Sequence, residues 1–331
     1  MQARPIGLAL RVSLACLAAV LTGAWTTHCF AQAAPPGFPS RPLKVVIGMQ
    51  AGTGSDLSAR FFCGQLAELI GQPCTVENKP GANGILAVQT VKQAPADGYT
   101  LILGSNSPMA VNPAILKNMG YDPLLDFKPI YGLTLHTNVM VVPITSAVHS
   151  VSELIETARG RRLNAGVYAS LYELATYWLA TVIGKDFLQV PYKGLPQLTV
   201  DMMGGQLDFA IVDLAGVAPL ITSGKLRAIA VLGDRPHPEF PDVPTVKDSG
   251  YPEFVNYSWV ALYLRSDVPP EITQRLVDAM EQIIKRPAAR AYVAKMNLEL
   301  MPLTPGAMRT FQIGEIERFK RIAAAAHLEP R

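Results

Sequence analysis

Apolar runs alternate with helix-like segments along the first part of the chain, and this alternation restricts the possible folds more than any other feature. Strands are predicted at Leu43–Ile47, Cys74–Asn78 and Tyr99–Gly104, and helices at Asp56–Ile70, at Asn83–Ala94 and from about Pro108. Parallel strands need a crossover connection, which is usually a helix. The βαβαβ order therefore predicts a parallel sheet covered by helices.

The pattern changes at Phe127, where two strands, Phe127–Leu133 and Asn138–Pro143, follow one another closely. A second α/β unit comes next. Its predicted strands are Asn164–Val167, Phe187–Tyr192, Leu207–Val212 and Leu226–Leu232, and its predicted helices are Ser150–Arg159, Tyr172–Ile183, Leu198–Met203 and Ala218–Ser223. A long strand, Tyr257–Leu264, and two amphipathic helices, Pro270–Ile284 and Pro305–Ile322, complete the chain.

This order predicts two α/β lobes, with the second lobe inserted into the first. Lobe 1 comprises residues 38–137 and 258–331, and lobe 2 comprises residues 138–257. The chain passes between the lobes twice, near Asn138 and near Tyr257, and these positions are expected to absorb a closing movement. Ligands of such sheets bind beyond the C-terminal ends of strands, close to helix N-termini.

Residues 1–33 are typical of a secretory signal peptide. Arg4 and Arg11 precede a short apolar run, Ser13–Ala24, and A-Q-A at Ala31–Ala33 is a small-residue cleavage site. A transmembrane anchor is the alternative, but the run is short for a bilayer. The sequence predicts cleavage near Ala33 and export to the periplasm.

The composition suits a globular chain, with 49% hydrophobic and 17% charged residues and a net charge of +3. No basic run or stripe stands out, so nucleic acid is not an expected partner. Cys16 and Cys29 lie in the signal segment, whereas Cys63 and Cys74 belong to the mature chain. These two either form a disulfide, which the periplasm permits, or remain buried thiols.

Three strand-to-helix turns have the composition of an anion site: Ala51–Asp56, Gly104–Pro108 and Val167–Glu173. Free N–H groups and the partial positive charge at a helix N-terminus attract anions. Each turn alone is equally an ordinary capped helix, with Ser55 or Asp56 as the cap of the first. Together they predict a site for a small carboxylate.

Signatures of enzymes are absent. G-T-G-S-D-L lacks the third glycine of a dinucleotide site, and no phosphate-binding loop or nucleophile elbow occurs. The mature histidines, His136, His149, His237 and His327, are widely separated, and no metal-ligand cluster or cofactor motif is present. His136 either faces the interlobe cleft or lies on the hinge surface.

Two charged residues are candidates for ligand contacts. Asp213 follows a strand and either accepts from a ligand amine or hydroxyl or caps the next turn. Lys193, in P-Y-K-G, either reaches the ligand or is a solvated charge at the lobe edge.

Several collinear blocks resemble the Bug family of periplasmic solute-binding proteins over about Phe38 to Leu328. They include F-P-S-R-P-L-K-V-V-I, A-G-T-G-S-D-L-S-A-R, G-Q-P-C-T-V-E-N-K-P-G-A-N-G, A-P-A-D-G-Y-T-L-I-L-G-S-N-S, V-P-Y-K-G and F-P-D-V-P-T-V-K-D-S-G. The resemblance implies a type II periplasmic-binding (Venus flytrap) fold. It also implies a small carboxylate ligand and a partner in the permease of a tripartite tricarboxylate transporter.

The resemblance implies a set of ligand-binding residues in both lobes. Lobe 1 would supply Gly52, Thr53, Gly54, Ser55, Ser105, Asn106 and Ser107; the crossover would supply Asn138; and lobe 2 would supply Ser170, Tyr192, Lys193 and Asp213.

The third turn departs from the family pattern. V-Y-A-S-L-Y-E stands where the family usually has a small polar run of the type G-N-G-S-S-S-H. Tyr168 and Tyr172 are expected to line the pocket and to narrow it, and Glu173 near the cleft would repel additional negative charge. This predicts a compact or aromatic monocarboxylate rather than a citrate-sized polyanion.

The sequence therefore predicts a monomeric, non-enzymatic receptor without cofactor or metal, which captures a small carboxylate for a tripartite tricarboxylate-type transporter. A receptor that presents its ligand to a sensor kinase would have the same fold and pocket. A periplasmic hydrolase would need an activated nucleophile, and no histidine is near a candidate serine in the sequence.

Overall fold

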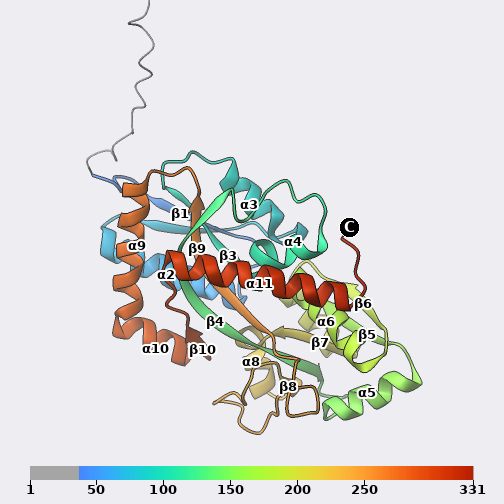
Figure 1. Ribbon diagram of the computed structural model, residues 1–331. Coiled ribbons are helices and arrows are strands. Elements are labelled where there is room, and N and C mark those ends of the chain that lie inside the picture. Colours follow the sequence, from blue (N-terminus) through green and yellow to red (C-terminus); the bar gives the residue numbers. More distant parts are fainter. Residues whose placement is uncertain (1–36, 331) are drawn as a thin grey trace, which may run out of the picture. The chain divides into compact units, whose positions relative to one another are not determined.

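The structure, a computed structural model, describes residues 37–330 (Figure 1). The predicted signal peptide, its cleavage site near Ala33 and the cysteines Cys16 and Cys29 lie outside the described residues. Within residues 37–330, no helix has both the length and the apolar character needed to cross a membrane.

Ten strands of the described chain belong to one sheet. They are β1 (Leu43–Ile47), β2 (Cys74–Asn78), β3 (Thr100–Ser105), β4 (Phe127–Pro143), β5 (Leu163–Val167), β6 (Phe187–Pro191), β7 (Phe209–Asp213), β8 (Leu226–Val231), β9 (Tyr257–Arg265) and β10 (Leu298–Leu300). The order is β2-β1-β3-β9-β4-β7-β5-β6, and β10 and β8 also pair with β4. Since β1 is parallel to both β2 and β3, the predicted βαβαβ unit is confirmed.

Helices cover the sheet and connect its strands (Figure 1). They are α2 (Gly54–Ile70), η1 (Ala82–Gly84), α3 (Ile85–Lys92), η2 (Ser107–Val111), α4 (Asn112–Ile115), α5 (Val151–Gly160), α6 (Ser170–Ile183), α7 (Leu195–Met203), α8 (Leu214–Thr222), α9 (Pro270–Lys285), α10 (Pro287–Lys295) and α11 (Pro305–Ala325). Helix α10 and strand β10 are short and were not predicted from the sequence. The predicted helix Asn83–Ala94 was wrong at its start, because Asn83 and Gly84 have positive φ and precede α3.

Strand β4 is one continuous element of 17 residues, so the prediction of two separate strands there was wrong. The polar stretch Thr134–Asn138 suggested a break, but Thr134, His136 and Asn138 are fully buried. The side chains of all three are hydrogen-bonded. Irregularities in the pairing with β9 near Gly132 bend the strand without ending it.

The partners of β4 change along its length. It is antiparallel to β9 as far as the Thr137–Tyr257 pair, and from Asn138 onward it pairs with β7 and β8. The change occurs where the sequence predicts the first passage between lobes. The lobe boundaries themselves remain a prediction, and we use lobe 1 and lobe 2 as names for the two predicted parts.

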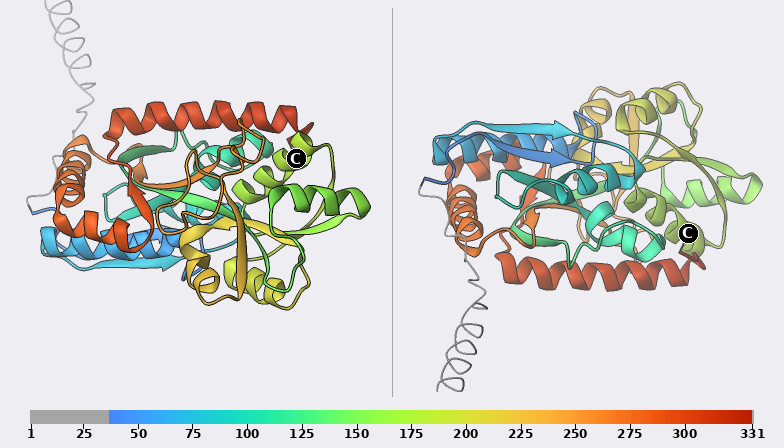
Figure 2. Two further views of the ribbon diagram at one scale, coloured as in Figure 1. Left: turned by 90° about the horizontal axis from the view of Figure 1, so that it is seen from below. Right: turned by 90° about the horizontal axis from the view of Figure 1, so that it is seen from above.

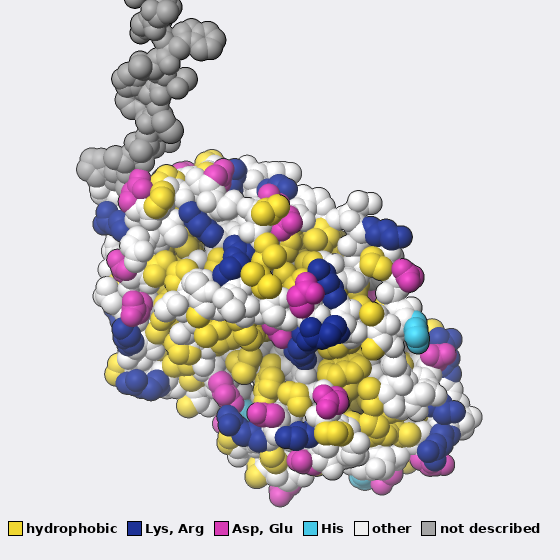
Figure 3. Space-filling model, in the orientation of Figure 1, with side chains coloured by type: hydrophobic (Ala, Val, Ile, Leu, Met, Phe, Trp, Pro, Cys, Tyr) yellow, Lys and Arg dark blue, Asp and Glu magenta, His cyan; other side chains and the backbone are white. Residues whose placement is uncertain are grey.

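Helix α11 lies along the described unit and contacts both β4 and α6 (Figure 2). Glu315 accepts a hydrogen bond of 3.1 Å from the indole N–H of the buried Trp259, and Arg318 donates to the carbonyl of Val255. In Figure 3 this face has hydrophobic side chains interspersed with charges of both signs. The C-terminal helix thus links β9 to the segment that precedes it.

Cys63 of α2 and Cys74 at the start of β2 form a disulfide, with their Cα atoms 5.4 Å apart. Of the two alternatives left open by the sequence, the structure therefore contains the disulfide. It fastens the C-terminal half of α2 to the edge strand of the sheet.

We expect that replacing both Cys63 and Cys74 by alanine lowers the free energy of unfolding by about 3 kcal/mol, because the cross-link restricts the unfolded chain. Denaturant titration measures the loss. A reducing agent should destabilise the wild-type protein to a similar extent and leave the double variant unaffected. Equal stability of the two proteins under oxidising conditions would contradict this expectation.

Candidate functional site

A cavity of about 210 Å³ lies where the three predicted turns meet. Its lining from lobe 1 includes Gly48, Met49, Gln50, Thr53, Gly81, Ala82, Asn83, Gly84, Ser105 and Pro108, and its lining from lobe 2 comprises Tyr168, Ala169, Tyr192, Lys193 and Gly194. A smaller hollow shares Thr53, Ser105 and Tyr168 with it. The turns predicted from the sequence thus do converge on one site.

The first turn is capped by Thr53. The hydroxyl of Thr53 accepts a hydrogen bond of 3.3 Å from Asp56 N and donates one of 3.0 Å to the carbonyl of Gln50. The expectation that Ser55 or Asp56 caps α2 was therefore wrong. The Asp56 carboxylate instead accepts from Gly52 N, and from Arg60 and Asn78.

Asp56 is charged in this arrangement. Burial alone raises the pKa of its carboxyl, but the hydrogen bonds from Arg60, Asn78 and Gly52 outweigh burial and hold the pKa below its ordinary value. Gly52 does not line the cavity, since its N–H is directed at this carboxylate. Ser55 lines only the smaller hollow.

The N-terminus of α2 already holds an anion, and it comes from the chain itself. Gly54 N donates a hydrogen bond of 3.0 Å to Oδ2 of Asp213, at the end of β7. The other oxygen, Oδ1, accepts from Ala215 N at 3.2 Å and so caps α8. Asp213 therefore does cap the next turn, which was one of its two predicted roles.

The residues of the second turn divide between cavity and framework. Ser105 lines both the cavity and the smaller hollow. Asn106 accepts a hydrogen bond of 2.6 Å from Trp259 N and donates to the carbonyl of Tyr257, and the Ser107 hydroxyl accepts from Leu171 N at 3.2 Å. Asn106 and Ser107 border the smaller hollow, but their side chains are hydrogen-bonded to β9 and to α6.

The third turn is closed by bulky and buried groups. Helix α6 begins at Ser170, whose hydroxyl donates to Oδ1 of Asn112 at 2.8 Å, and Ser170 does not line the cavity. The rings of Tyr168 and Tyr172 are 4.5 Å apart, and the Tyr172 hydroxyl lies 3.3 Å from that of Ser258.

Both tyrosines remain uncharged. Burial, followed by the nearby charge of Asp213, raises the pKa of Tyr172 above its ordinary value. Burial likewise raises the pKa of Tyr168 well above its ordinary value, and its neighbour Tyr172 and the Asp213 carboxylate add to the effect. Tyr168 forms part of the cavity wall, whereas Tyr172 lies behind it and reaches only the smaller hollow.

Glu173 lies away from the cavity, contrary to the prediction. It lines a separate hollow with Tyr177 and Leu328, and its carbonyl accepts from the Gln189 side chain. A helix turns about 100° per residue, so the residue after Tyr172 faces another direction. Repulsion from Glu173 therefore no longer supports a preference for monocarboxylates.

Tyr192 and Lys193 of lobe 2 line the cavity, and their contact with a ligand stays a prediction. The Tyr192 hydroxyl donates to Asp201 at 2.7 Å, so the ring rather than the hydroxyl is available. Burial and this hydrogen bond to Asp201 raise the pKa of Tyr192 to about 12. Lys193 is exposed and is the one charged side chain among the described residues that line the cavity.

Asn138 and His136 are buried in the framework behind the site. Asn138 donates to the carbonyl of Asn256 and accepts from Ser258 at 2.6 Å, and it does not line the cavity. His136 lies neither in the cavity nor on the surface, since its side chain is fully buried and hydrogen-bonded to Thr134 at 2.8 Å.

A fourth turn, Gly81–Gly84, also lines the cavity and was not predicted from the sequence. Its φ angles are 122°, 46°, 56° and 85°, so Ala82 and Asn83 adopt a left-handed conformation that side chains disfavour. Gly48 packs against it so closely that an added Cβ would lie 2.7 Å from the Cα of Gly84. The run K-P-G-A-N-G after a predicted strand was the available signal. Strained backbone beside a cavity suggests a functional role.

Among residues 37–330 there is no group of three His, Cys, Asp or Glu side chains arranged to hold a metal ion. Hydroxyls, backbone, aromatic rings and one ammonium group line the cavity. Such a surface is suited to binding a small polar molecule.

Comparisons with known proteins agree on the class of protein. A family model described as "Tripartite tricarboxylate transporter family receptor" matches residues 58–328. Protein BugT of Bordetella pertussis is 30% identical over 289 residues, which cover 85% of this chain and 88% of BugT.

Solved structures give the same result. Rpa4515 of R. palustris, solved with adipate, has a TM-score of 0.85 and 30% identity, covering 89% of this chain and all of that one. MatC from Rhodopseudomonas palustris, solved with bound malate, has a TM-score of 0.82 and 25% identity, covering 86% of this chain and 99% of that one. BugD, described as a periplasmic binding protein, has a TM-score of 0.84 and 25% identity, covering 89% of this chain and all of that one. The chain has the two-lobe α/β fold of these structures.

We expect that Gly84→Ala lowers the free energy of unfolding by about 1–2 kcal/mol, because a side chain is disfavoured at its φ of 85°. The new Cβ would also lie 3.2 Å from Cγ of Pro108. Thermal unfolding followed by circular dichroism measures the change. Gly314→Ala in α11, where an added Cβ meets nothing within 4 Å, is the control and should not destabilise the protein.

Proposed function

This chain belongs to the tripartite tricarboxylate transporter receptor family, and we propose that it captures a small carboxylate in the periplasm and delivers it to the permease of such a transporter. The observation that carries the proposal is the cavity of about 210 Å³ at the meeting of the turns, with Lys193 at its wall. Relatives of the same fold were solved with adipate and with malate, which are both carboxylates.

The residues that line the cavity are the proposed ligand contacts. Lys193 provides the positive charge, the hydroxyl of Ser105 donates a hydrogen bond, and the backbone of Gly81–Gly84 provides a polar wall. Thr53 also lines the cavity, but its hydroxyl proton is already donated to the carbonyl of Gln50. The rings of Tyr168 and Tyr192 cover the apolar part of the ligand. Ser55, Asn106, Ser107 and Tyr172 border only the smaller hollow and support these contacts from behind.

Ligand release requires a movement between the lobes, because residues of both lobes line the cavity. We place the hinge at the two predicted crossings, near Asn138 and Tyr257, which neighbour each other through the Thr137–Tyr257 pair of β4 and β9. Opening there would separate Tyr168, Tyr192 and Lys193 from Thr53 and Ser105. Closure would exclude water from the bound carboxylate and strengthen its polar contacts.

We expect that a matching small carboxylate raises the Tm of the protein, because it binds the native state and not the unfolded chain. At a ligand concentration of a hundred times Kd the stabilisation is about 2.7 kcal/mol. A thermal-shift screen of mono- and dicarboxylates measures it, with the corresponding amides as controls. A folded protein that no carboxylate shifts would count against the proposed function.

We expect that Lys193→Gln weakens carboxylate binding roughly fivefold, because it removes the charge that faces the cavity. The effect stays modest because Lys193 is exposed and water screens its charge. Isothermal titration of the acid identified in the screen gives the change in Kd. Lys225→Gln, an exposed lysine of lobe 2 outside the cavity lining, is the control and should leave Kd unchanged.

A further inference from the structure

We propose that Asp213, Gly54 and His136 form a latch that holds the two lobes together directly, independently of what occupies the cavity. In this assignment Asp213 is a positioning residue and not a ligand contact. The inference rests on the proposed function only where it concerns ligand affinity, since the latch itself acts in the ligand-free protein.

The central contact joins segments that are far apart in the sequence. Gly54 N and Asp213 Oδ2 are separated by 159 residues and lie 3.0 Å apart, in a buried position. Gly54 is the first residue of α2, where the helix carries its partial positive charge, and Asp213 supplies a carboxylate to it. A charged acceptor on a helix N-terminus is stronger than a neutral hydrogen bond.

Position 54 requires glycine because there is no space for a side chain, and not because of its φ angle. A Cβ at position 54 would lie 2.1 Å from Oδ2 of Asp213 and 2.8 Å from Nδ1 of His136. The backbone of α2 therefore touches both side chains, and no larger residue fits while the lobes keep this arrangement. Alanine is otherwise favourable in a helix, so the constraint comes from Asp213 of lobe 2 and from His136 of β4.

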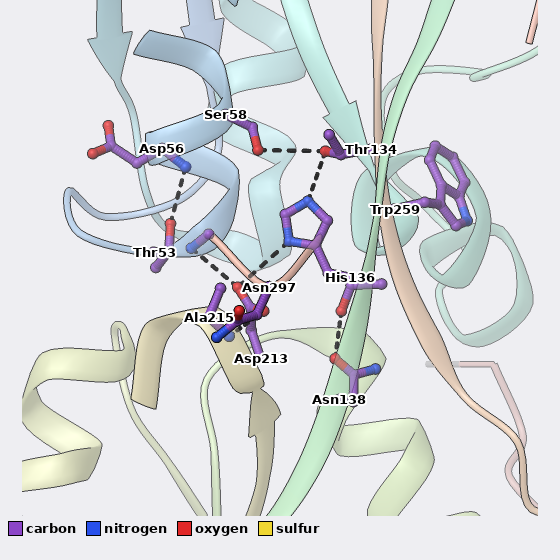
Figure 4. A network of polar contacts seen from close by, with 12 residues as sticks. Thr53, Asp56, Ser58, Thr134, His136, Asn138, Asp213, Ala215, Trp259 and Asn297 are labelled. Atoms are coloured by element: carbon purple, nitrogen blue, oxygen red, sulfur yellow. Dashed lines mark hydrogen bonds and ion pairs between the residues drawn. The ribbon is translucent and has the colours of Figure 1, made fainter. Parts of the chain in front are cut away.

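His136 completes the latch from β4. Its Nδ1 is buried without a hydrogen-bond partner and lies 3.6 Å from Oδ2 of Asp213. In Figure 4 a dashed line joins the imidazole of His136 to the Asp213 carboxylate. Its Nε2 is 2.8 Å from the hydroxyl of Thr134, which lies 3.3 Å from that of Ser58 in α2. These hydrogen bonds therefore connect His136 to α2, the helix that Asp213 also contacts, and they fix the position of the imidazole ring.

The latch and the cavity use different residues. Neither Gly54, Asp213 nor His136 lines the cavity of 210 Å³, although Asp213 borders the smaller hollow. A change in the latch alters the population of the closed form, and the apparent Kd of every ligand is inversely proportional to that population. Latch variants should therefore weaken all ligands by one common factor, whereas cavity variants should change the ratios between ligands.

Two variants disrupt the Gly54–Asp213 contact, one by a change in each lobe. Asp213→Asn leaves a single amide oxygen for the two donors Gly54 N and Ala215 N. Because Asn caps a helix as well as Asp does, this variant can still cap α8. Gly54→Ala introduces the obstructing Cβ. Gly64→Ala is the matched control, because Gly64 belongs to the same helix and an added Cβ there meets nothing within 4 Å.

The first measurement is the distance between spin labels at the exposed positions Lys117 and Lys225, one in each lobe, in ligand-free protein. We expect Asp213→Asn and Gly54→Ala to shift the distribution toward longer or more widely spread distances, and Gly64→Ala to leave it unchanged. In titrations with several carboxylates, the two latch variants should raise each Kd by the same factor, roughly tenfold.

The latch is refuted if both folded variants keep the wild-type distance distribution, or if they change the ranking of ligands instead of the common affinity. The double variant Gly54→Ala with Asp213→Asn should lose less affinity than the sum of the two single losses, because both changes break one contact. Failure of the proposed function has a different signature: no carboxylate binds the wild-type protein, while the label distances still report the latch.

Discussion

The pairing of β4 determines where the other parts of the site lie. This strand is antiparallel to β9 up to Thr137 and to β7 and β8 from Asn138, and it places Asn138 opposite Asp213. His136, two residues earlier on the same face, consequently lies beside the Asp213 carboxylate and the start of α2. Buried polar side chains on a strand cost free energy unless they are paired. The hydrogen bonds of Thr134, His136 and Asn138 offset that cost and fix the register of the strand.

The helix N-termini at the site are occupied mainly by the chain's own groups. Asp213 accepts from Gly54 N, the Thr53 hydroxyl from Asp56 N, and the Ser107 hydroxyl from Leu171 N. A helix start attracts an external anion only through N–H groups that remain free. Much of the capacity of these turns for binding anions is therefore used by contacts within the chain. In the proposed function, the recognition of a ligand falls to Lys193, the Ser105 hydroxyl and the Gly81–Gly84 turn.

Apolar periodicity was sufficient to predict most strands and the α/β class, because strand and helix burial leave clear patterns in a sequence. It failed where polar side chains are buried, as at Thr134 and His136 in β4, since a pattern cannot show that a partner exists. Turn composition identified the region of the site, and Thr53, Ser105, Tyr168, Tyr192 and Lys193 do meet there. It could not show which N–H groups are already used, nor that Glu173 faces another hollow, because both depend on contacts between segments distant in the sequence.

The separation of latch and cavity has a consequence for specificity. If the ligand alone held the lobes together, each change in the cavity would alter both selectivity and the population of the closed form. The Gly54–Asp213 contact contributes to closure through groups that line no part of the main cavity. A change at Tyr168 can then reshape the cavity wall without removing the contact between Gly54 and Asp213. A receptor built in this way can acquire a new ligand through a few wall residues, while β4, Asp213 and the start of α2 retain their geometry.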